Sequence, residues 1–387
     1  MDATRRGFLR SSTWSSVLLP WTFLSLRGGS PSAAGQPQNQ PVLFTGDGLN
    51  LSPAEHSALL RKLVDDADFK PDSYLQGGAV ERLEQRFAAV LGKERALFFP
   101  TGTLANHLAL RQLAGDRRRV LVQSESHVYC DEGDGAQLLS GLNLIPLAPG
   151  RATVEAEEIA QAVNRSSEPP YPVRVGAISI ESPIRRRNGE VFDFEEMKKI
   201  SAFAREKGIG LHLDGARLFL ASAYTRIPPL QYAALFDTVY VSLYKYLNAP
   251  FGAILAGPHS LLKSMVALRH QFGSGLYHAW QPAAVALHYL EGFTERYQSA
   301  VERSEELLRL IQDSAGIRLE RVPSGSNIVG IHIPDGRAGT FQQRLADAGI
   351  IVRKPAPDSQ IIWLMINETI NRRPPQELAR QFLAALR

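Results

Sequence analysis

Two stretches decide the fold: residues 210–217, which read GLHLDGAR, and residues 238–252, which read TVYVSLYKYLNAPFG. Each begins as a short apolar run, the pattern of a strand that is buried on both faces. The first run ends at Asp214, and the second leads to Lys245, 31 positions further on. The residues on either side of these two runs extend the same pattern.

From about residue 80 to 257 the chain alternates between short apolar strands and helical repeats. Helices are predicted between most of the strands, for example over 155–163 and 194–206. This alternation predicts an α/β fold with a large domain whose sheet is mostly parallel and covered on both faces. The predicted strands are 96–99, 120–123, 144–147, 175–180, 210–213, 238–243 and 253–256.

After residue 258 the pattern is mainly helical to about 313. A strand at 327–333, a helix at 340–348, two further strands and a final helix from Pro374 follow. A chain of 387 residues suits one large and one smaller domain. We predict a linker and N-terminal arm at 35–48, a large domain at 49–275 and a small α+β domain at 276–387.

The first 34 residues are predicted to be an export signal. Residues 4–10, TRRGFLR, resemble a twin-arginine signal, and small residues at 32–34 offer a cleavage site before Gly35. The apolar part is shorter than the ~20 residues of a spanning helix, so no membrane span is expected in the mature chain. The alternatives are an uncleaved anchor or a disordered leader. The signal predicts a periplasmic protein.

Charge and cysteine content narrow the function further. Of the formal net charge of +4, the first 34 residues carry +3, so nucleic acid is not an expected partner. The run Arg185–Arg187 is expected to be a solvated loop or a contact to an anion or a neighbouring subunit. The single Cys130 excludes an internal disulfide. No metal site is predicted.

Four predicted strands deliver polar groups to one edge of the sheet. Ligands of open α/β sheets collect beyond the carboxyl ends of the strands. Strand 96–99 leads into residues 100–103, PTGT, and strand 120–123 leads into residues 124–127, SESH. Together with Asp214 and Lys245, residues 100–103 and 124–127 form one predicted site. Groups from four strands at one edge support this site more strongly than any single residue does.

Each group at this edge also has a simpler interpretation. Thr101, Gly102 and Thr103 open a helix and could cradle a phosphate, or Thr101 could be an ordinary N-cap. His127 could stack on a cofactor ring or transfer a proton, or could be a structural histidine. Arg217 could bind a substrate carboxylate or make a surface ion pair.

A lysine and an aspartate that each follow a strand are what a pyridoxal phosphate (PLP) site needs. The amine of Lys245 would hold PLP as an imine, and the carboxylate of Asp214 would keep the pyridine nitrogen protonated. An Asp-Gly turn is the alternative for Asp214. Tyr244 and Tyr246 flank Lys245, and burial against their rings is expected to lower its pKa.

These segments resemble the threonine aldolase and β-eliminating lyase family of PLP enzymes. The similar motifs are residues 92–103, GKERALFFPTGT, residues 126–127, residues 212–217, HLDGAR, and Lys245 with residues 249–250, and they run from about residue 46 to the end. The resemblance implies the aspartate-aminotransferase fold, fold type I. It also implies a homodimer or homotetramer with sites near the subunit interface, acting on a small amino acid.

The resemblance also implies a role for each matching residue. Lys245 would form the imine, Asp214 would pair with the pyridine nitrogen, and His127 would stack on the ring. Arg217 would meet the substrate carboxylate. The remaining cofactor contacts would come from Thr101, Gly102, Thr103, Ser242 and Arg269, the last one to a neighbouring subunit's phosphate.

The sequence departs from the pattern of this family in three places, which concern residues expected to bind the substrate more than residues expected to bind the cofactor. Tyrosines replace the residues usual on either side of Lys245, and Trp363 or Ile362 stands where a second carboxylate-binding arginine is expected. Arg353 or Lys354 could substitute for it. Gly46 replaces a serine, and residues 182–184 lack the expected asparagine and histidine. Tyr244, Tyr246 and Trp363 therefore predict a bulky or aromatic β-substituent.

Three functions follow as hypotheses. The first is a PLP-dependent lyase that cleaves a β-hydroxy-α-amino acid to glycine and an aldehyde, with Lys245, His127 and Asp214 as catalytic residues. The second keeps PLP but performs β-elimination, racemisation or transamination. The third is an exported, non-catalytic protein that uses the fold to bind an amino compound or a partner.

Overall fold

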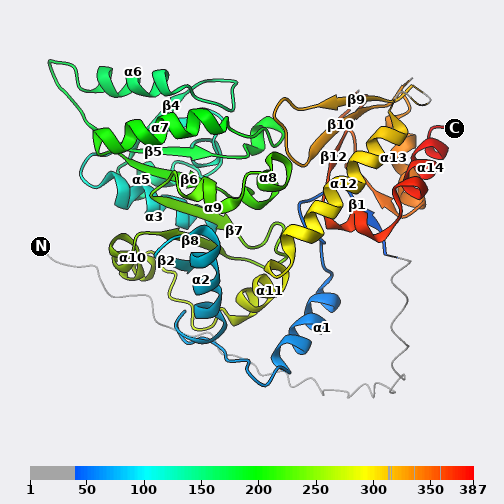
Figure 1. Cartoon of the computed structure of the whole chain (residues 1–387), viewed down its shortest axis with the longest axis horizontal. Coiled ribbons are helices and arrows are strands. Elements are labelled where there is room, and N and C mark those ends of the chain that lie inside the picture. The colour runs from blue at the N-terminus through cyan, green and yellow to red at the C-terminus, as the bar shows by residue number, and fades with distance from the viewer. Residues whose placement is uncertain (1–39, 313, 315, 335, 358) are drawn as a thin grey trace, which may run out of the picture. The chain divides into compact units, whose positions relative to one another are not determined.

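The computed structural model describes residues 40–387, apart from 313, 315, 335 and 358. The predicted export signal and the start of the predicted linker lie outside the described residues. In the part that is described, no helix is both long and apolar enough to cross a membrane. Figure 1 shows the order of the elements along the chain.

A seven-stranded sheet forms the centre of the large domain and confirms the predicted fold class. Its order is β2-β8-β7-β6-β5-β3-β4, and every neighbouring pair is parallel except those of β8, which runs antiparallel to β2 and β7. All seven strands lie within about one residue of the predicted ranges. They are β2 (Arg95–Phe99), β3 (Arg119–Gln123), β4 (Asn143–Leu147), β5 (Val175–Glu181), β6 (Gly210–Asp214), β7 (Thr238–Ser242) and β8 (Ala253–Gly257).

Alternate residues of the strands bury themselves on opposite faces of this sheet. In β2, Ala96 and Phe98 pack into one hydrophobic cluster, whereas Leu97 and Phe99 pack into another. The period of two directs successive side chains to opposite faces, so apolar residues at every position require helices on both sides. One face is covered by α2 (Gly78–Leu91), α6 (Ala156–Ser166) and α7 (Phe194–Lys207), and the other by α3 (Gly102–Ala114) and α10 (His259–Gln271).

The C-terminal part has its own sheet and core. Its antiparallel strands have the order β12-β10-β9, with β12 at Ile361–Met365, β10 at Ile328–His332 and β9 at Arg318–Arg321. Helices α13 (Ala338–Asp347) and α14 (Pro375–Ala385) contribute to the same core. Strand β9 was not predicted, because its sequence RLER contains a single apolar residue.

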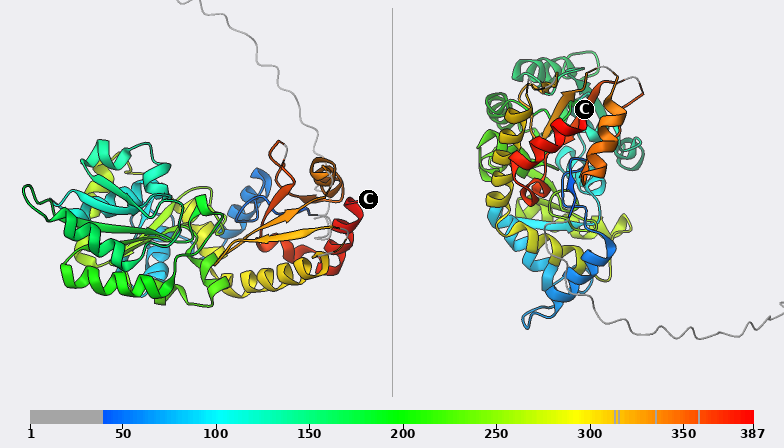
Figure 2. Two further views of the ribbon diagram at one scale, coloured as in Figure 1. Left: turned by 90° about the horizontal axis from the view of Figure 1, so that it is seen from above. Right: turned by 90° about the vertical axis from the view of Figure 1, so that its right-hand side faces the viewer.

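The N-terminal arm belongs to this second core. Strand β1 (Val42–Leu43) pairs in parallel with β11 (Ile350–Ile351), and Val42 and Phe44 are fully buried there. The two cores meet along α12 (Phe293–Ile311), the long yellow helix in Figures 1 and 2. Its Tyr297 packs in the large cluster and its Ala300 in the small one. The predicted boundary at 275/276 remains a prediction.

Several shorter elements complete the described chain. Helix α11 packs against α2, and α1 packs against α11. The bounds are α1 (Pro53–Val64), α4 (His127–Cys130), α5 (Gly135–Ser140), η2 (Arg185–Arg187), α8 (Leu218–Thr225), α9 (Pro229–Ala233), α11 (Trp280–Leu290) and η3 (Glu368–Arg372).

The close approach of α3 to β7 requires glycine at position 102. A Cβ there would lie 2.0 Å from the hydroxyl oxygen of Tyr240. We predict that Gly102→Ala lowers the free energy of unfolding by about 1–3 kcal/mol, because the helix must shift away from the sheet. Gly135→Ala is the control, since its Cβ would meet nothing within 4 Å and it also begins a helix.

Urea denaturation of both variants measures this difference. The control is expected to be neutral or slightly stabilised. Equal stability of the two variants would contradict the argument from close packing.

Candidate active site

A cavity of about 550 Å³ lies beyond the carboxyl ends of β5, β6 and β7. Its walls are formed by residues within the ranges 43–56, 214–217 and 240–250. His127, Glu181 and Arg185 complete them. Of the predicted site residues, it collects Lys245, Asp214, His127, Arg217 and Tyr244. The edge of the sheet named from the sequence is therefore the edge that holds the cavity.

A relay of hydrogen bonds orients Asp214, which is only 3% exposed. The amide nitrogen of Asn106 donates to Oδ2 of Asp214 at 2.7 Å, and the backbone N–H of Ala216 donates to Oδ1 at 3.1 Å. The Oδ1 atom of Asn106 lies 3.0 Å from Nε2 of His212, whose Nδ1 lies 2.8 Å from the hydroxyl of Thr238.

The protonation of this relay follows from its geometry. Because Asn106 uses its amino group on Asp214, its oxygen must accept, so Nε2 of His212 carries the hydrogen. Burial lowers the pKa of His212 to about 4, so the ring is neutral and its Nδ1 accepts from Thr238. The relay thus presents an N–H donor to Asp214 and fixes the direction of its carboxyl group.

Lys245 has an amine prepared for nucleophilic chemistry. Its Nζ lies 3.5 Å from the hydroxyl of Tyr244 and 4.8 Å from the centre of that ring. Burial, together with the positive charge of Arg217, lowers the pKa of Lys245 to about 8. The neutral, reactive amine is therefore present near neutral pH to a far greater extent than in an ordinary lysine.

Only one of the two tyrosines beside Lys245 reaches the cavity. Tyr246 is 1% exposed and packs in the large core, with ring centres 5.9 Å from Phe219 and 5.2 Å from Phe293. The prediction that the rings of both tyrosines bury the amine is therefore wrong for Tyr246. The reason is that the ring of Tyr246 makes its apolar contacts in the core, with Phe219 and Phe293.

Two other predicted residues lie elsewhere. Trp363 sits in β12 opposite Gly330 and is not among the cavity residues, so the predicted substrate contact is not made there. Arg269 is buried in α10, donates to the carbonyl of Phe98 and lies over the ring of Phe99. Nη1 is therefore used within the chain, and the predicted contact of Arg269 to a neighbouring subunit's phosphate stays a prediction.

The predicted phosphate residues lie at the start of α3 and the end of β7. Thr101 is the N-cap of α3, and its hydroxyl accepts from the N–H of Leu104 at 3.2 Å. Gly102 is buried against β7, and Thr103 is exposed on the first helical turn. The hydroxyl of Ser242 is buried and has no hydrogen-bond partner among the described residues. A buried hydroxyl left unpaired is unfavourable by about 1–3 kcal/mol, so a phosphate oxygen would satisfy it.

Arg217 is held by an ion pair across the cavity. Its Nε and Nη2 both lie 2.9 Å from Oδ2 of Asp47, and the amide of Asn327 donates to Oδ1 at 3.1 Å. Burial alone would raise the pKa of Asp47, but the charge and hydrogen bonds of Arg217 outweigh burial and leave that pKa below its usual value. The sequence indicated Arg217, whereas Asp47 was noted only as part of a matching motif.

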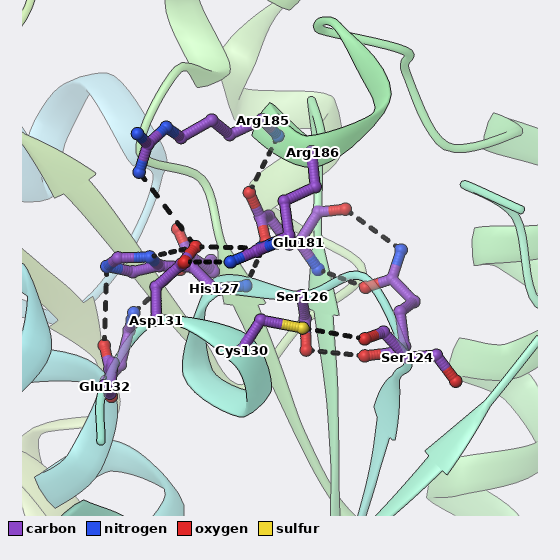
Figure 3. Close-up of polar contacts among 12 residues, drawn as sticks. Ser124, Ser126, His127, Cys130, Asp131, Glu132, Glu181, Arg185 and Arg186 are labelled. Carbon is purple, nitrogen blue, oxygen red and sulfur yellow. Dashed lines mark hydrogen bonds and ion pairs between the residues drawn. The ribbon is translucent and has the colours of Figure 1, made fainter. Parts of the chain in front are cut away.

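His127 is bracketed by two acidic side chains, as Figure 3 shows. Its Nδ1 lies 3.1 Å from Oδ2 of Asp131, and its Nε2 lies 3.9 Å from Oε1 of Glu132. Its backbone N–H donates to Glu181 at 2.6 Å. The contact of Nδ1 to Asp131 is within hydrogen-bond distance, whereas 3.9 Å is too long for a hydrogen bond from Nε2 to Glu132. Nε2 is therefore the ring atom that can accept a proton or hold a water.

More buried acid lies near the cavity than the sequence suggested. The carboxyl group of Glu132 lies beside His127 rather than in the cavity wall, and burial, with the charge of Asp214, raises its pKa to about 8. Burial also raises the pKa of Glu181. Glu181 ends β5 as Asp214 ends β6, so the strand-end rule could have found it. Glu132 lies in the acidic, glycine-rich run 131–135, which is typical of a solvated turn.

The ion pair between Arg217 and Asp47 yields a prediction about stability. The side chains are 12% and 6% exposed, so Asp47→Asn leaves a buried cation unpaired. We expect a loss of about 3–5 kcal/mol in the free energy of unfolding. Glu305→Gln breaks the exposed pair with Arg321, whose side chains are 46% and 50% exposed, and should cost under about 1 kcal/mol. If chemical denaturation showed a larger loss of stability for Glu305→Gln than for Asp47→Asn, the buried pair would not be a major source of stability.

Comparison with known proteins agrees with this geometry. The family model described as beta-eliminating lyase matches residues 57–334. The low specificity L-threonine aldolases of Saccharomyces cerevisiae and Candida albicans are 31% and 30% identical over 66% and 67% of this chain. The matches span 66% and 70% of those proteins, about two thirds of their own length.

Solved structures give the same result. A crystal structure from Exiguobacterium sp. 255-15, assigned to the aromatic amino acid beta-eliminating lyases and threonine aldolases, has a TM-score of 0.75 and 26% identity. It covers 90% of this chain and 97% of its own. The α/β fold with its C-terminal domain is that of the fold-type I PLP enzymes. The chain belongs to the beta-eliminating lyase family.

Proposed function

We propose that this protein is a PLP-dependent carbon–carbon lyase that cleaves a β-hydroxy-α-amino acid into glycine and an aldehyde. The observation that carries the proposal is one cavity that holds a lysine of lowered pKa and a buried, oriented aspartate. The curated relatives are named threonine aldolases, and the reaction class follows from them.

The residues present fit the cofactor. Lys245 would hold its aldehyde carbon covalently, and Asp214 would face its ring nitrogen. The unpaired hydroxyl of Ser242 and the start of α3 at Gly102 and Thr103 would receive its phosphate. When bound, PLP supplies an electron sink for the pair released from the broken Cα–Cβ bond.

The chain's own groups bind, orient and move protons. Hydrogen bonds from Asn106 and the Ala216 N–H hold Asp214 in place, and as a carboxylate it would favour a protonated ring. Arg217 offers donors to the substrate carboxylate on the side not used by Asp47. A proton must leave the β-hydroxyl, and Nε2 of His127, for which the structure gives no hydrogen-bond partner among the described residues, would take it directly or through a water.

The size of the β-substituent is a narrower part of the proposal. Of the three rings predicted to surround the substrate, only Tyr244 lines the cavity. It is 49% exposed and stands at the mouth. The preference for a bulky or aromatic substituent therefore rests on Tyr244 alone.

Export and assembly complete the proposal. We infer from residues 4–10 that the chain is exported by the twin-arginine route to the periplasm. Retention of the mature chain in the cytoplasm of wild-type cells would refute this. We also infer a homodimer or homotetramer from the family resemblance, and sedimentation at micromolar concentration would reveal a monomer instead.

The reaction itself is tested with two substrates. The PLP-loaded protein is expected to release acetaldehyde from threonine and benzaldehyde from phenylserine, with equimolar glycine. Lys245→Ala should lower the rate by at least about a thousandfold, because the covalent attachment is lost. Release of keto acid or ammonia without aldehyde would instead favour β-elimination or transamination, and no turnover of either substrate would refute the proposal.

The amine of Lys245 gives a pH dependence. Because its pKa is about 8, the neutral fraction rises about tenfold per pH unit below that value and levels off above it. We therefore predict that the rate of PLP uptake by the apo-protein rises with pH and reaches half its plateau near pH 8. A midpoint above about pH 10, as for an exposed lysine, would show that burial does not tune the amine.

A further inference from the structure

We propose that Arg185 binds a carboxylate of the substrate at the mouth of the cavity. This inference rests on the proposed function, since it names a residue that recognises the substrate of that reaction. No sequence motif gave Arg185 a role toward the substrate. The run Arg185–Arg187 was expected to be a solvated loop or a contact to an anion or a neighbouring subunit, and in the structure its three members have different contacts.

The backbone of Arg185 is held in place while its side chain is exposed. Its N–H donates to Oε1 of Glu181 at 3.1 Å, and Glu181 also fixes the backbone of His127. The loop is closed by the bridge between Ile184 and Glu190. The side chain of Arg185 is 63% exposed and forms part of the cavity wall. A fixed backbone with an adaptable cation is suited to meeting an incoming anion.

The nearest carboxylate to Arg185 is already occupied. Nη1 of Arg185 lies 4.0 Å from Oδ2 of Asp131. That aspartate is 2.6 Å from Nη2 of Arg186 and 3.1 Å from Nδ1 of His127. Figure 3 shows all of these groups converging on the one carboxylate. Asp131 therefore binds Arg186 and His127 closely, and its distance of 4.0 Å from Arg185 leaves the charge of Arg185 only weakly neutralised.

The other cations of the cavity have partners or a different task. Arg217 is bound through Nε and Nη2 to Asp47. Lys245 is the proposed attachment point of the cofactor. Trp363 and Ile362, one of which occupies the position where a second arginine was expected, are not among the cavity residues. Among the cavity residues that the structure describes, Arg185 is thus the arginine with the least engaged guanidinium.

A substrate carboxylate can come from two places. The α-carboxylate is common to all amino acids, whereas a β-substituent can carry a second one, as in 3-hydroxyaspartate. Cleavage of the Cα–Cβ bond in 3-hydroxyaspartate gives glycine and glyoxylate, with the hydroxyl proton leaving and one proton added at Cα. Both sources present the same group to Arg185, and substrate comparison distinguishes them.

The test compares Arg185→Gln with Arg187→Gln. Arg187 belongs to the same short helix but pairs with Glu190 at 3.2 Å and is not a cavity residue, so it is a matched control. KM and kcat are measured with threonine and with 3-hydroxyaspartate. Arg185→Gln is expected to raise KM about ten- to hundredfold with little change in kcat, because it removes a charge-assisted contact. Arg185→Lys should restore part of the loss.

Each outcome is decisive. A rise in KM for both substrates assigns Arg185 to the α-carboxylate, and a rise for 3-hydroxyaspartate alone assigns it to the β-carboxylate. Unchanged KM values for both, or equal effects of Arg187→Gln, overturn the inference.

A calorimetric titration separates this inference from the proposed function. Aspartate carries both carboxylates and has no β-hydroxyl to cleave, so its binding should weaken at least about tenfold in Arg185→Gln, whereas ethanolamine, which has no carboxylate, should be unaffected. This holds even if neither substrate releases an aldehyde, which would count against the lyase alone. Equal weakening of aspartate and ethanolamine, or no detectable aspartate binding to the wild-type protein, would refute the role of Arg185.

Discussion

Buried carboxyl groups in and beside one cavity constrain the rest of this site. Asp214 receives hydrogen bonds on both oxygens, whereas the pKa values of Glu181 and Glu132 are raised by burial and by the charge of Asp214. Negative charges repel strongly in a medium of low polarity. The hydrogen-bond relay through Asn106 and His212 holds Asp214 in place among these groups. A cationic ring beside Asp214 would relieve the remaining repulsion, so the protein favours such a ligand.

The cavity depends on parts of the chain that are far apart in sequence. Asp47, from the N-terminal arm, binds Arg217 of the large domain and Asn327 of the small one. The N–H of Leu49 donates to the side chain of Asn248, close to Lys245. These contacts place residues of the arm in the cavity wall. Burial is the main reason why the pKa of Lys245 is low, and the charge of Asp47 opposes that shift.

The fold was predictable because its signals are local. Each of the seven central strands is a short apolar run between helical repeats, and the polar residue after a run marks the functional edge. Asp214, Lys245 and His127 were found in this way. The direction of neighbouring side chains was not predictable, because it depends on which tertiary contact is larger. The ring of Tyr246 packs in the core against Phe219 and Phe293, and the guanidinium of Arg269 donates to the carbonyl of Phe98. The acids Asp131 and Glu132 were missed because their run resembles an exposed turn.

The central claim is that one amine, that of Lys245, carries the cofactor opposite a buried carboxylate. Reduction of the PLP-loaded protein with borohydride, followed by peptide mass mapping, tests it most directly. The account predicts a single pyridoxyl phosphate adduct, on the peptide that contains Lys245, and none in Lys245→Ala. An adduct on another lysine, or no adduct at all, would contradict it.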